Sequence, residues 1–297
     1  MPDIGKTPQI SIIILNWNTP EDTIKCIESI LRNTIFDSYE IIVIDNGSDR
    51  KEKEKIKERS KTLPDFVKII YLPKNLGVPA GYNCGVSVAK GKYFEIMNSD
   101  TTVEKDWLKE KLNTFLSEPN VAGVTSRLFE DNCYVYSDQK QYLKTLHGAS
   151  MMISRLVFER VGEFDAKNFS PLYSDELDWS YRARRMGFKL LLSPKSVVYH
   201  HCSQSAKKYS DNKTMLYIRL RNRMKHRLFN YTINDWLDKN EFKQFTREFY
   251  HSIRDGYLFL LIKAWMTTIF DIQTVIYERI GRRKRRNRFK IQLIKDS

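Results

Sequence analysis

Three mainly apolar runs, each followed at once by polar turn residues, constrain the fold of this chain more than any other feature. The runs are residues 10–15 before Asn16, residues 40–44 before Asp45, and residues 92–97 before Asn98. Runs without polar alternation are typical of parallel strands that are covered on both faces. Segments with helical periodicity separate the runs. This alternation predicts βαβ units in an α/β fold with a mostly parallel sheet and flanking helices.

The segments between the runs carry helix signals. Thr19 and Pro20 predict the start of one helix, with Thr19 as its cap. In another segment, Gly77, Gly81 and Gly85 recur every four residues. Two interpretations of this spacing stay open: close packing of a helix on the sheet, or the lining of a ligand site.

The polar residues after the runs are candidates for binding. Ligands of open α/β sheets lie outside the carboxyl ends of the strands. Asp100 is suited to bind Mg²⁺ or Mn²⁺, which prefer carboxylates and substrate phosphates. Asp45 is suited to accept hydrogen bonds from a base or a ribose. The alternative for both is ordinary turn chemistry, because Asn, Asp, Ser and Gly favour turns.

A second candidate centre lies at a predicted helix start. Ser174 predicts the cap of a helix whose first turn holds Asp175 and Glu176. The helix dipole favours ionised carboxylates there, and such a carboxylate at a cleft suits a general base. The alternative is that both acids only complement the dipole. Asp178 and Arg182, one turn apart, predict an ion pair within the helix.

The net charge of +14 in 297 residues belongs to the last third of the chain. Residues 279–290 carry +8 and residues 219–227 carry +5, without an acid in either, which leaves +1 for the rest.

The four cysteines are scattered, which argues against a zinc site or a disulfide framework. Neither GxxxxGK[ST] nor GxGxxG occurs, which argues against P-loop NTPases and dinucleotide enzymes. The distribution of charged and apolar residues along the sequence predicts no secretory signal and no membrane-spanning helix.

Seven motifs, in this order, resemble those of the family 2 glycosyltransferases. They are NWN at 16–18, VIDNGSD at 43–49, NLGVPAGYNCG at 75–85, IMNSDT at 96–101, HGASMMI at 147–153, SDELDWSYRARRMGFK at 174–189 and VVYHHCSQS at 197–205. Within the family, the chain is similar to the rhamnosyltransferase-like branch of cell-surface glycan and polysaccharide assembly. The resemblance covers about residues 10–205, with a fainter echo at Arg221, Asn222 and Arg223, and implies a GT-A fold.

The resemblance also implies roles for single residues. Asp45 would contact the nucleotide base, Asp100 and His200 would hold a divalent cation, Mg²⁺ or Mn²⁺, and Glu176 would be the catalytic base with Asp175 beside it. The further nucleotide-sugar-binding residues implied are Asn16, Asn18, Asn75, Gly77, Asn83, Asn98 and His147. The implied reaction is a hexosyl transfer with inversion, from a nucleotide-diphosphate sugar to a hydroxyl of a glycan acceptor.

Two positions depart from the family pattern. The first acid of the usual DxD motif is Asn98, which leaves Asp100 as one certain carboxylate. The usual Glu-Asp pair is reversed to Asp175-Glu176, so either acid remains a candidate base. We therefore expect activity with a looser metal site.

The chain divides by composition into a glycosyltransferase domain at 1–205 and a basic helical extension at 206–297. Residues 257–277 predict one apolar helix with a narrow polar stripe at Lys263, Thr267 and Asp271. Its apolar face predicts either membrane binding or packing on protein, with a second copy of the chain as one alternative. The arginine-rich segment 282–288 favours lipid phosphates or an anionic membrane. We expect a cytoplasmic enzyme, peripheral on the inner face of the cell membrane, with a polyprenyl-lipid-linked acceptor.

Two other classes of protein are weighed against a glycosyltransferase. A nucleotidyltransferase also uses a metal and an α/β sheet. A non-catalytic nucleic-acid-binding protein would explain the basic tail. No recognised nucleic-acid module occurs in the sequence, so no nucleic-acid partner is expected.

Overall fold

The computed structural model describes residues 7–130, 133–201 and 211–295, with side chains as far as residue 285. One mixed sheet of nine strands runs through this part of the chain, in the order β3-β2-β1-β4-β8-β6-β9-β5, with β7 beside β6. The strands are β1 Ile10–Asn16, β2 Tyr39–Asp45, β3 Val67–Tyr71, β4 Tyr93–Asn98, β5 Thr101–Val103, β6 Val121–Glu130, β7 Cys133–Tyr134, β8 Ser150–Ser154 and β9 Lys189–His200.

The first half of the sheet confirms the predicted parallel units. β1 pairs in parallel with β2 and with β4, and β2 pairs in parallel with β3. The register sets Asn16 opposite Asp45 and Leu15 opposite Asn98, so the polar strand ends lie at one edge. In the second half, β8 runs antiparallel to β4 and β6, while β6 and β9 are parallel. The sheet is therefore mixed, because β8 is inserted in the opposite direction.

Helices cover both faces of the sheet. They are α1 Pro20–Asn33, α2 Arg50–Ser60, α3 Val78–Val88, α4 Trp107–Leu116, α5 Arg155–Val161, α6 Ala166–Phe169 and α7 Asp175–Arg185. The apolar residues of α1, α2 and α4 form one core cluster with β1 and β2, and those of α3, α5 and α7 form another with the opposite face.

The glycine spacing of α3 serves close packing. A Cβ atom on Gly81 would lie 2.4 Å from the Leu15 side chain, and one on Gly85 would lie 2.3 Å from Ile13. Larger residues would push α3 off β1, so these two glycines let the helix lie directly on the strand. The packing interpretation of this motif is confirmed for Gly81 and Gly85.

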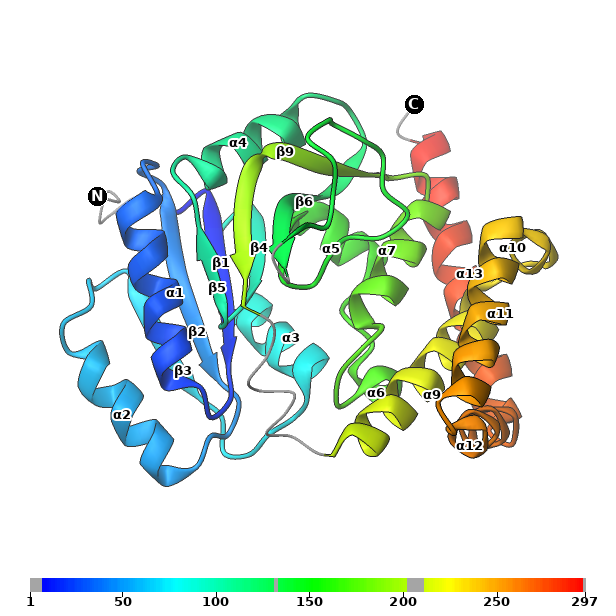
Figure 1. Ribbon diagram of the computed structural model, residues 1–297. Coiled ribbons are helices and arrows are strands. Elements are labelled where there is room, and N and C mark those ends of the chain that lie inside the picture. The colour runs from blue at the N-terminus through cyan, green and yellow to red at the C-terminus, as the bar shows by residue number, and fades with distance from the viewer. Residues whose placement is uncertain (1–6, 131–132, 202–210, 296–297) are drawn as a thin grey trace.

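Five helices form the C-terminal region: α9 Asn212–Asn230, α10 Ile233–Leu237, α11 Lys239–Arg254, α12 Leu258–Ile269 and α13 Ile272–Lys295. Figure 1 shows them gathered on the side of the molecule away from α1 and α2. The predicted single helix over 257–277 is wrong, because α12 ends at Ile269 and α13 turns by 65°. The proposed domain boundary between 205 and 206 lies outside the described residues.

No single helix in the described ranges has the length and apolar composition needed to cross a membrane. The bent pair of α12 and residues 272–285 meets that requirement only when the two are taken together.

A fully buried ion pair joins two strands to α4 beneath the polar sheet edge. The Lys111 ammonium lies 2.6 Å from Glu95 Oε1 and 2.6 Å from Ser150 Oγ, and neither charged side chain is exposed. Burial raises the pKa of Glu95 and lowers that of Lys111, while their mutual attraction opposes both shifts. The pair thus ties β4, the strand that leads into the turn at Asp100, and its neighbour β8 to one helix.

Lys111→Met is expected to lower the free energy of unfolding by about 3–5 kcal/mol, the usual cost of removing one partner of a buried ion pair. The double variant Glu95→Leu/Lys111→Met removes both charges and should recover most of that loss. Ser150 keeps a partner in the double variant, because its hydroxyl also lies 3.2 Å from Ser126 Oγ. Chemical denaturation measures all three proteins. A double variant no more stable than Lys111→Met would contradict this account.

Candidate active site

The ends of β1 and β2 form a buried polar cluster. Asn16 Nδ2 donates to Asp45 Oδ2 at 2.7 Å, and the backbone N–H of Ser48 donates to Asp45 Oδ1 at 3.1 Å. Asp45 is fully buried; its Oδ1 holds the turn that follows β2, and its Oδ2 holds Asn16 at the end of β1. The turn interpretation of Asp45 is therefore confirmed, and its contact with a nucleotide base stays a prediction.

Two neighbouring turns complete this edge of the sheet. Asn18 Oδ1 accepts from the N–H of Asp49 at 2.8 Å, which joins the turn after β1 to the turn after β2. Asn75 Oδ1 accepts from the Gly77 N–H at 2.8 Å and from Asn46 Nδ2 at 3.1 Å. Gly77 has a φ of 86°, which suits glycine, and it caps α3. The structure thus brings five predicted residues together at one edge: Asn16, Asn18, Asp45, Asn75 and Gly77.

The candidate metal residues meet where β5 pairs with the end of β9. This antiparallel pairing sets Thr101 opposite His200, which brings the His200 ring to Asp100. His200 Nε2 lies 3.2 Å from Asp100 Oδ1, and His200 Nδ1 bonds to Glu130 Oε1 at the end of β6. Burial works to lower the pKa of His200, but the hydrogen bonds to Asp100 and Glu130 raise it to about 9. Two carboxylates thus orient one imidazole.

These residues fit a divalent cation in part. Among the described residues, no three His, Cys, Asp or Glu side chains converge on a metal position. Asp100 supplies one carboxylate, and His200 supplies one imidazole once a cation displaces its ring proton, and both groups are acceptable to Mn²⁺. A cation held by few protein ligands takes the others from substrate phosphates and water. The Glu130–His200 contact is the arrangement that orients ligating histidines. Sequence reasoning missed Glu130, which lies in no motif.

Asn98 and His147 flank this pair. Asn98 Nδ2 lies 3.2 Å from His200 Nε2, and Asn98 Oδ1 accepts from the Tyr82 hydroxyl at 3.0 Å. The rings of His147 and His200 lie 6.3 Å apart, edge to face. Burial raises the pKa of Tyr82 well above its ordinary value, helped by the charges of Asp175, Asp100 and Glu176. Tyr82, which the sequence did not single out, therefore stands among the acids of both candidate centres.

The two acids of the second centre begin α7. Asp175 is buried, and burial together with the neighbouring Glu176 carboxylate raises its pKa well above the ordinary range. Glu176 is half-buried, and its side chain lies 3.8 Å from where a Cβ on Gly148 would be. The Glu176 charge also acts on His147, whose ring lies 6.3 Å from that of His200, so the two centres are neighbours. Asn83, by contrast, pairs with the backbone of Phe164 at 2.8 Å and 3.1 Å, and its contact with a nucleotide sugar stays a prediction.

The loop before α7 is held from outside the predicted motifs. Tyr173 and Ser174 adopt left-handed φ values of 73° and 70°, which cost energy in residues other than glycine. Asn222 Nδ2 on α9 lies within hydrogen-bond distance of three backbone carbonyls in the stretch from the end of α6 to α7. The distances are 3.1 Å to Phe169, 2.9 Å to Leu172 and 3.1 Å to Tyr173. A buried amide on α9 thus fixes the approach to Asp175 and Glu176.

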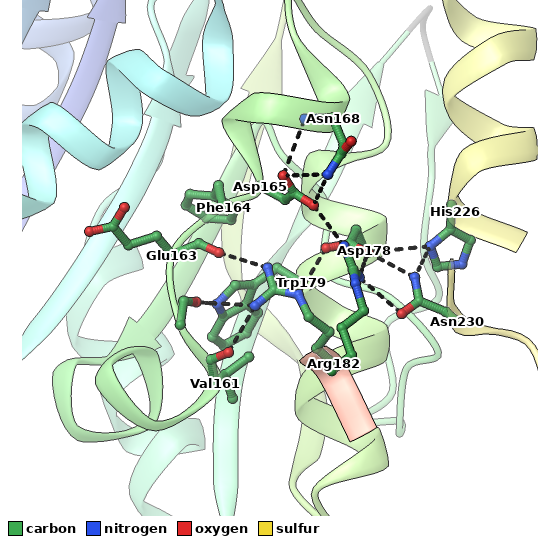
Figure 2. A network of polar contacts seen from close by, with 12 residues as sticks. Val161, Glu163, Phe164, Asp165, Asn168, Asp178, Trp179, Arg182, His226 and Asn230 are labelled. Carbon is green, nitrogen blue, oxygen red and sulfur yellow. Dashed lines mark hydrogen bonds and ion pairs between the residues drawn. The ribbon is translucent and has the colours of Figure 1, made fainter. Parts of the chain in front are cut away.

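One turn further along α7, Asp178 is the centre of a buried charge network (Figure 2). Asp178 confirms the predicted pair with Arg182 at 2.8 Å and also accepts from Asn230 Nδ2 at 2.8 Å. Arg282 on α13 bonds to Asp178 Oδ1, the oxygen that also accepts from Asn230, and lies 2.7 Å from Asp165. Arg282 was expected to bind lipid phosphates. Its side chain is instead 13% exposed and paired inside the protein, because Asp178 has no access to water.

Comparison with known proteins agrees with this geometry. The model of the family described as "Glycosyl transferase family 2" matches residues 11–210. One relative, the putative glycosyltransferase EpsH of Bacillus subtilis, is 29% identical over 152 residues, which are 48% of this chain and 43% of that protein. This chain thus spans less than half of the length of that relative.

Two solved structures share the fold. GalNAc-T7 with UDP, GalNAc and Mn²⁺ has a TM-score of 0.62 at 17% identity, covering 76% of this chain and 48% of that one. The mannosyltransferase PcManGT of Pyrobaculum calidifontis, with GDP-Man and Mn²⁺, has a TM-score of 0.60 at 17% identity, covering 89% and 76%. The expected GT-A fold is confirmed, here with a mixed sheet and a C-terminal helical region.

Glu130→Gln is expected to weaken Mn²⁺ binding by about 10–100-fold, the usual effect of removing the partner that orients a ligating histidine. Asp100→Asn should abolish Mn²⁺ binding and leave the fold intact. Isothermal titration with Mn²⁺ measures both. Glu104→Gln is the matched control, because Glu104 accepts from the hydroxyl of Tyr199, the residue before His200. Unchanged Mn²⁺ affinity in Glu130→Gln would remove Glu130 from the site.

Proposed function

Because the chain belongs to glycosyl transferase family 2, we propose that it moves a sugar from a nucleotide-diphosphate sugar to a hydroxyl group of a glycan, with inversion at the anomeric carbon. The observation that carries this proposal is the meeting of two acidic centres around Tyr82 and Gly148: Asp100 with His200 on one side, Asp175 with Glu176 on the other. One centre suits the diphosphate and the other suits the hydroxyl.

The two acids of α7, Asp175 and Glu176, have different roles in the proposed reaction. Burial and the neighbouring carboxylate favour a proton on Asp175, which leaves Glu176 to accept the proton of the incoming hydroxyl. Glu176 is also the more exposed of the two, so a substrate reaches it first. The hydrogen bonds from Asn222 hold the loop that leads into α7, which supports a fixed position of Glu176 for this role.

At the opposite side, Asp100 and His200 would hold a divalent cation next to the diphosphate of the donor, which becomes the leaving group. A divalent cation bound there supplies positive charge that stabilises the departing nucleoside diphosphate. The Mn²⁺ of both structural neighbours supports this cofactor, and their UDP and GDP-Man support a nucleotide-sugar donor. The rhamnosyltransferase-like branch remains a hypothesis about donor and acceptor.

A donor screen separates the proposed reaction from its main alternative. The protein is incubated with Mn²⁺ and UDP-, dTDP- or GDP-sugars, and release of nucleoside diphosphate is measured. A nucleotidyltransferase would instead release pyrophosphate from a sugar phosphate and a nucleoside triphosphate. Family membership favours the first outcome over this alternative and over a non-catalytic nucleic-acid-binding protein.

Glu176→Gln is expected to lower kcat by roughly 10²–10⁴-fold, the usual contribution of a general base. Donor affinity should stay within twofold, because the base acts on the acceptor. Asp175→Asn is the matched variant, and it should lose less activity because Asp175 is the protonated partner. Steady-state kinetics and donor titration check both variants. A larger loss in Asp175→Asn would reassign the base to Asp175.

We further propose that the enzyme works at the inner face of the cell membrane on a lipid-linked acceptor. Helix α12 packs on α9 through Leu261, Ala264 and Thr268 and turns large apolar side chains outward. The exposed fractions are 74% for Phe259, 42% for Ile262, 48% for Met266, 53% for Ile269 and 78% for Phe270. Such a face, together with the exposed Arg283 and Lys284 further along α13, suits an anionic membrane surface.

Co-sedimentation with vesicles tests this location. The full-length protein should bind vesicles that contain anionic lipid, more weakly as salt rises, because each basic residue near the surface contributes about 1 kcal/mol over a Debye length. Phe259→Ser/Phe270→Ser should abolish binding without unfolding, since both side chains are exposed. Leu116→Ser, at a 60% exposed leucine on α4, is the control and should bind normally. Equal binding to neutral vesicles, or none to either, would assign this face to protein contacts.

A further inference from the structure

A cavity of about 470 Å³ lies between α7, the end of α9 and α13, away from the acids of the candidate active site. Six arginines line it: Arg182, Arg185, Arg279, Arg282, Arg283 and Arg285. No acidic residue of the described chain is among its lining residues. The volume is in the range of small-molecule sites, which run from about 300 to 1,000 Å³.

The positive charge of this arginine cavity is only partly neutralised. Arg282 pairs with Asp165, Asp178 and Glu278 from behind the wall. The six guanidinium groups exceed these three carboxylates by three positive charges. Asp235 lies within electrostatic range of Arg185, and counting its carboxylate reduces the excess to two positive charges. Within the described part of the chain, no carboxylate lies at ion-pair distance from Arg185 or Arg283. Two or more positive charges therefore face the cavity without a counterion.

The lining arginines also keep hydrogen-bond donors for a ligand. A guanidinium group carries five N–H donors in a fixed fork that matches phosphate oxygens. In the described structure, Arg279 donates to the carbonyls of Leu228 and Tyr231, and Arg285 donates to that of Val161. These bonds fix the two side chains in place without neutralising their charge. The site is therefore preorganised for an anion.

An apolar stripe leads out of the arginine cavity along α13. Ile276 and Ile280 belong to its lining, and Ile272 precedes them at the same four-residue spacing. Their exposed fractions are 50% for Ile272, 52% for Ile276 and 50% for Ile280. Buried Phe229 forms part of the inner wall. A ligand that fills the site would place an anionic group among the arginines and a hydrocarbon chain along the isoleucines.

We propose that the arginine cavity binds a phosphate ester that carries a hydrocarbon chain, as in a lipid phosphate, at a site separate from the metal centre. The phosphate accepts hydrogen bonds from Arg185 and Arg283, and the chain lies on Ile276 and Ile280. Because Arg182 and Arg282 also hold Asp178 on α7, the occupied cavity adjoins the helix whose first turn carries Asp175 and Glu176. The site does not depend on the proposed sugar transfer.

Calorimetric titration of the full chain with hexyl phosphate and with inorganic phosphate, without divalent cations, tests the proposal. Hexyl phosphate should bind at least tenfold more tightly than inorganic phosphate, which would indicate a lipid source over a free phosphate. Arg185→Gln/Arg283→Gln should weaken both probes by tenfold or more. Ile280→Ser should weaken hexyl phosphate alone.

Neighbouring residues that point away from the cavity supply a matched control. Arg184→Gln/Lys284→Gln removes the same charge from the same helices, and both side chains are exposed and outside the lining. It should keep the affinity of the unsubstituted protein. Asp100→Asn should also bind both probes normally, which separates this site from the metal centre. No binding of hexyl phosphate, equal affinity for both probes, or an equal loss in the control pair would overturn the proposal.

Discussion

The charge of Asp178 is the constraint on which the arrangement of α7 depends. A carboxylate with no exposed surface is stable only if paired and hydrogen-bonded groups replace its water. Burial acts to raise the pKa of Asp178, but Arg282 and Arg182 hold it well below its ordinary value. One of these arginines comes from α7 and the other from α13, and Asn230 comes from α9. The helix that carries the candidate base is therefore held by the C-terminal region.

Much of the first half of the site could be predicted from sequence, because it depends on short-range patterns. Apolar runs that end in Asn16, Asp45 and Asn98 specify strands, and parallel pairing in register brings strand ends to one edge. Glu130 could not be predicted in this way. It ends a strand without a motif, and only the pairing of β6 with β9 brings it to His200. Asn222 belongs to a faint echo of the family pattern at residues 221–223, but only the packing of α9 shows that its amide holds the loop before α7.

The failed prediction of one helix over 257–277 has a physical cause. Polar residues continue at helical spacing from Lys263 through Thr267 and Asp271, and no glycine or proline marks the break near Phe270. The break is set by tertiary contacts: α12 lies along α9, whereas α13 must turn to bring Arg282 to Asp178. Periodicity reports which face of a helix is apolar, but not where packing redirects the chain.

The same contacts bear on what forms a folding unit in this protein. The family model ends at residue 210, before α9 begins. A chain cut there would leave Asp178 with Arg182 as its one described ionic partner, and would leave the carbonyls of Phe169, Leu172 and Tyr173 without the Asn222 amide. Each loss removes compensation from a buried polar group, which costs more than the bond itself contributes. The basic C-terminal helices are thus structural supports of the acids on α7, whatever surface their outer faces contact.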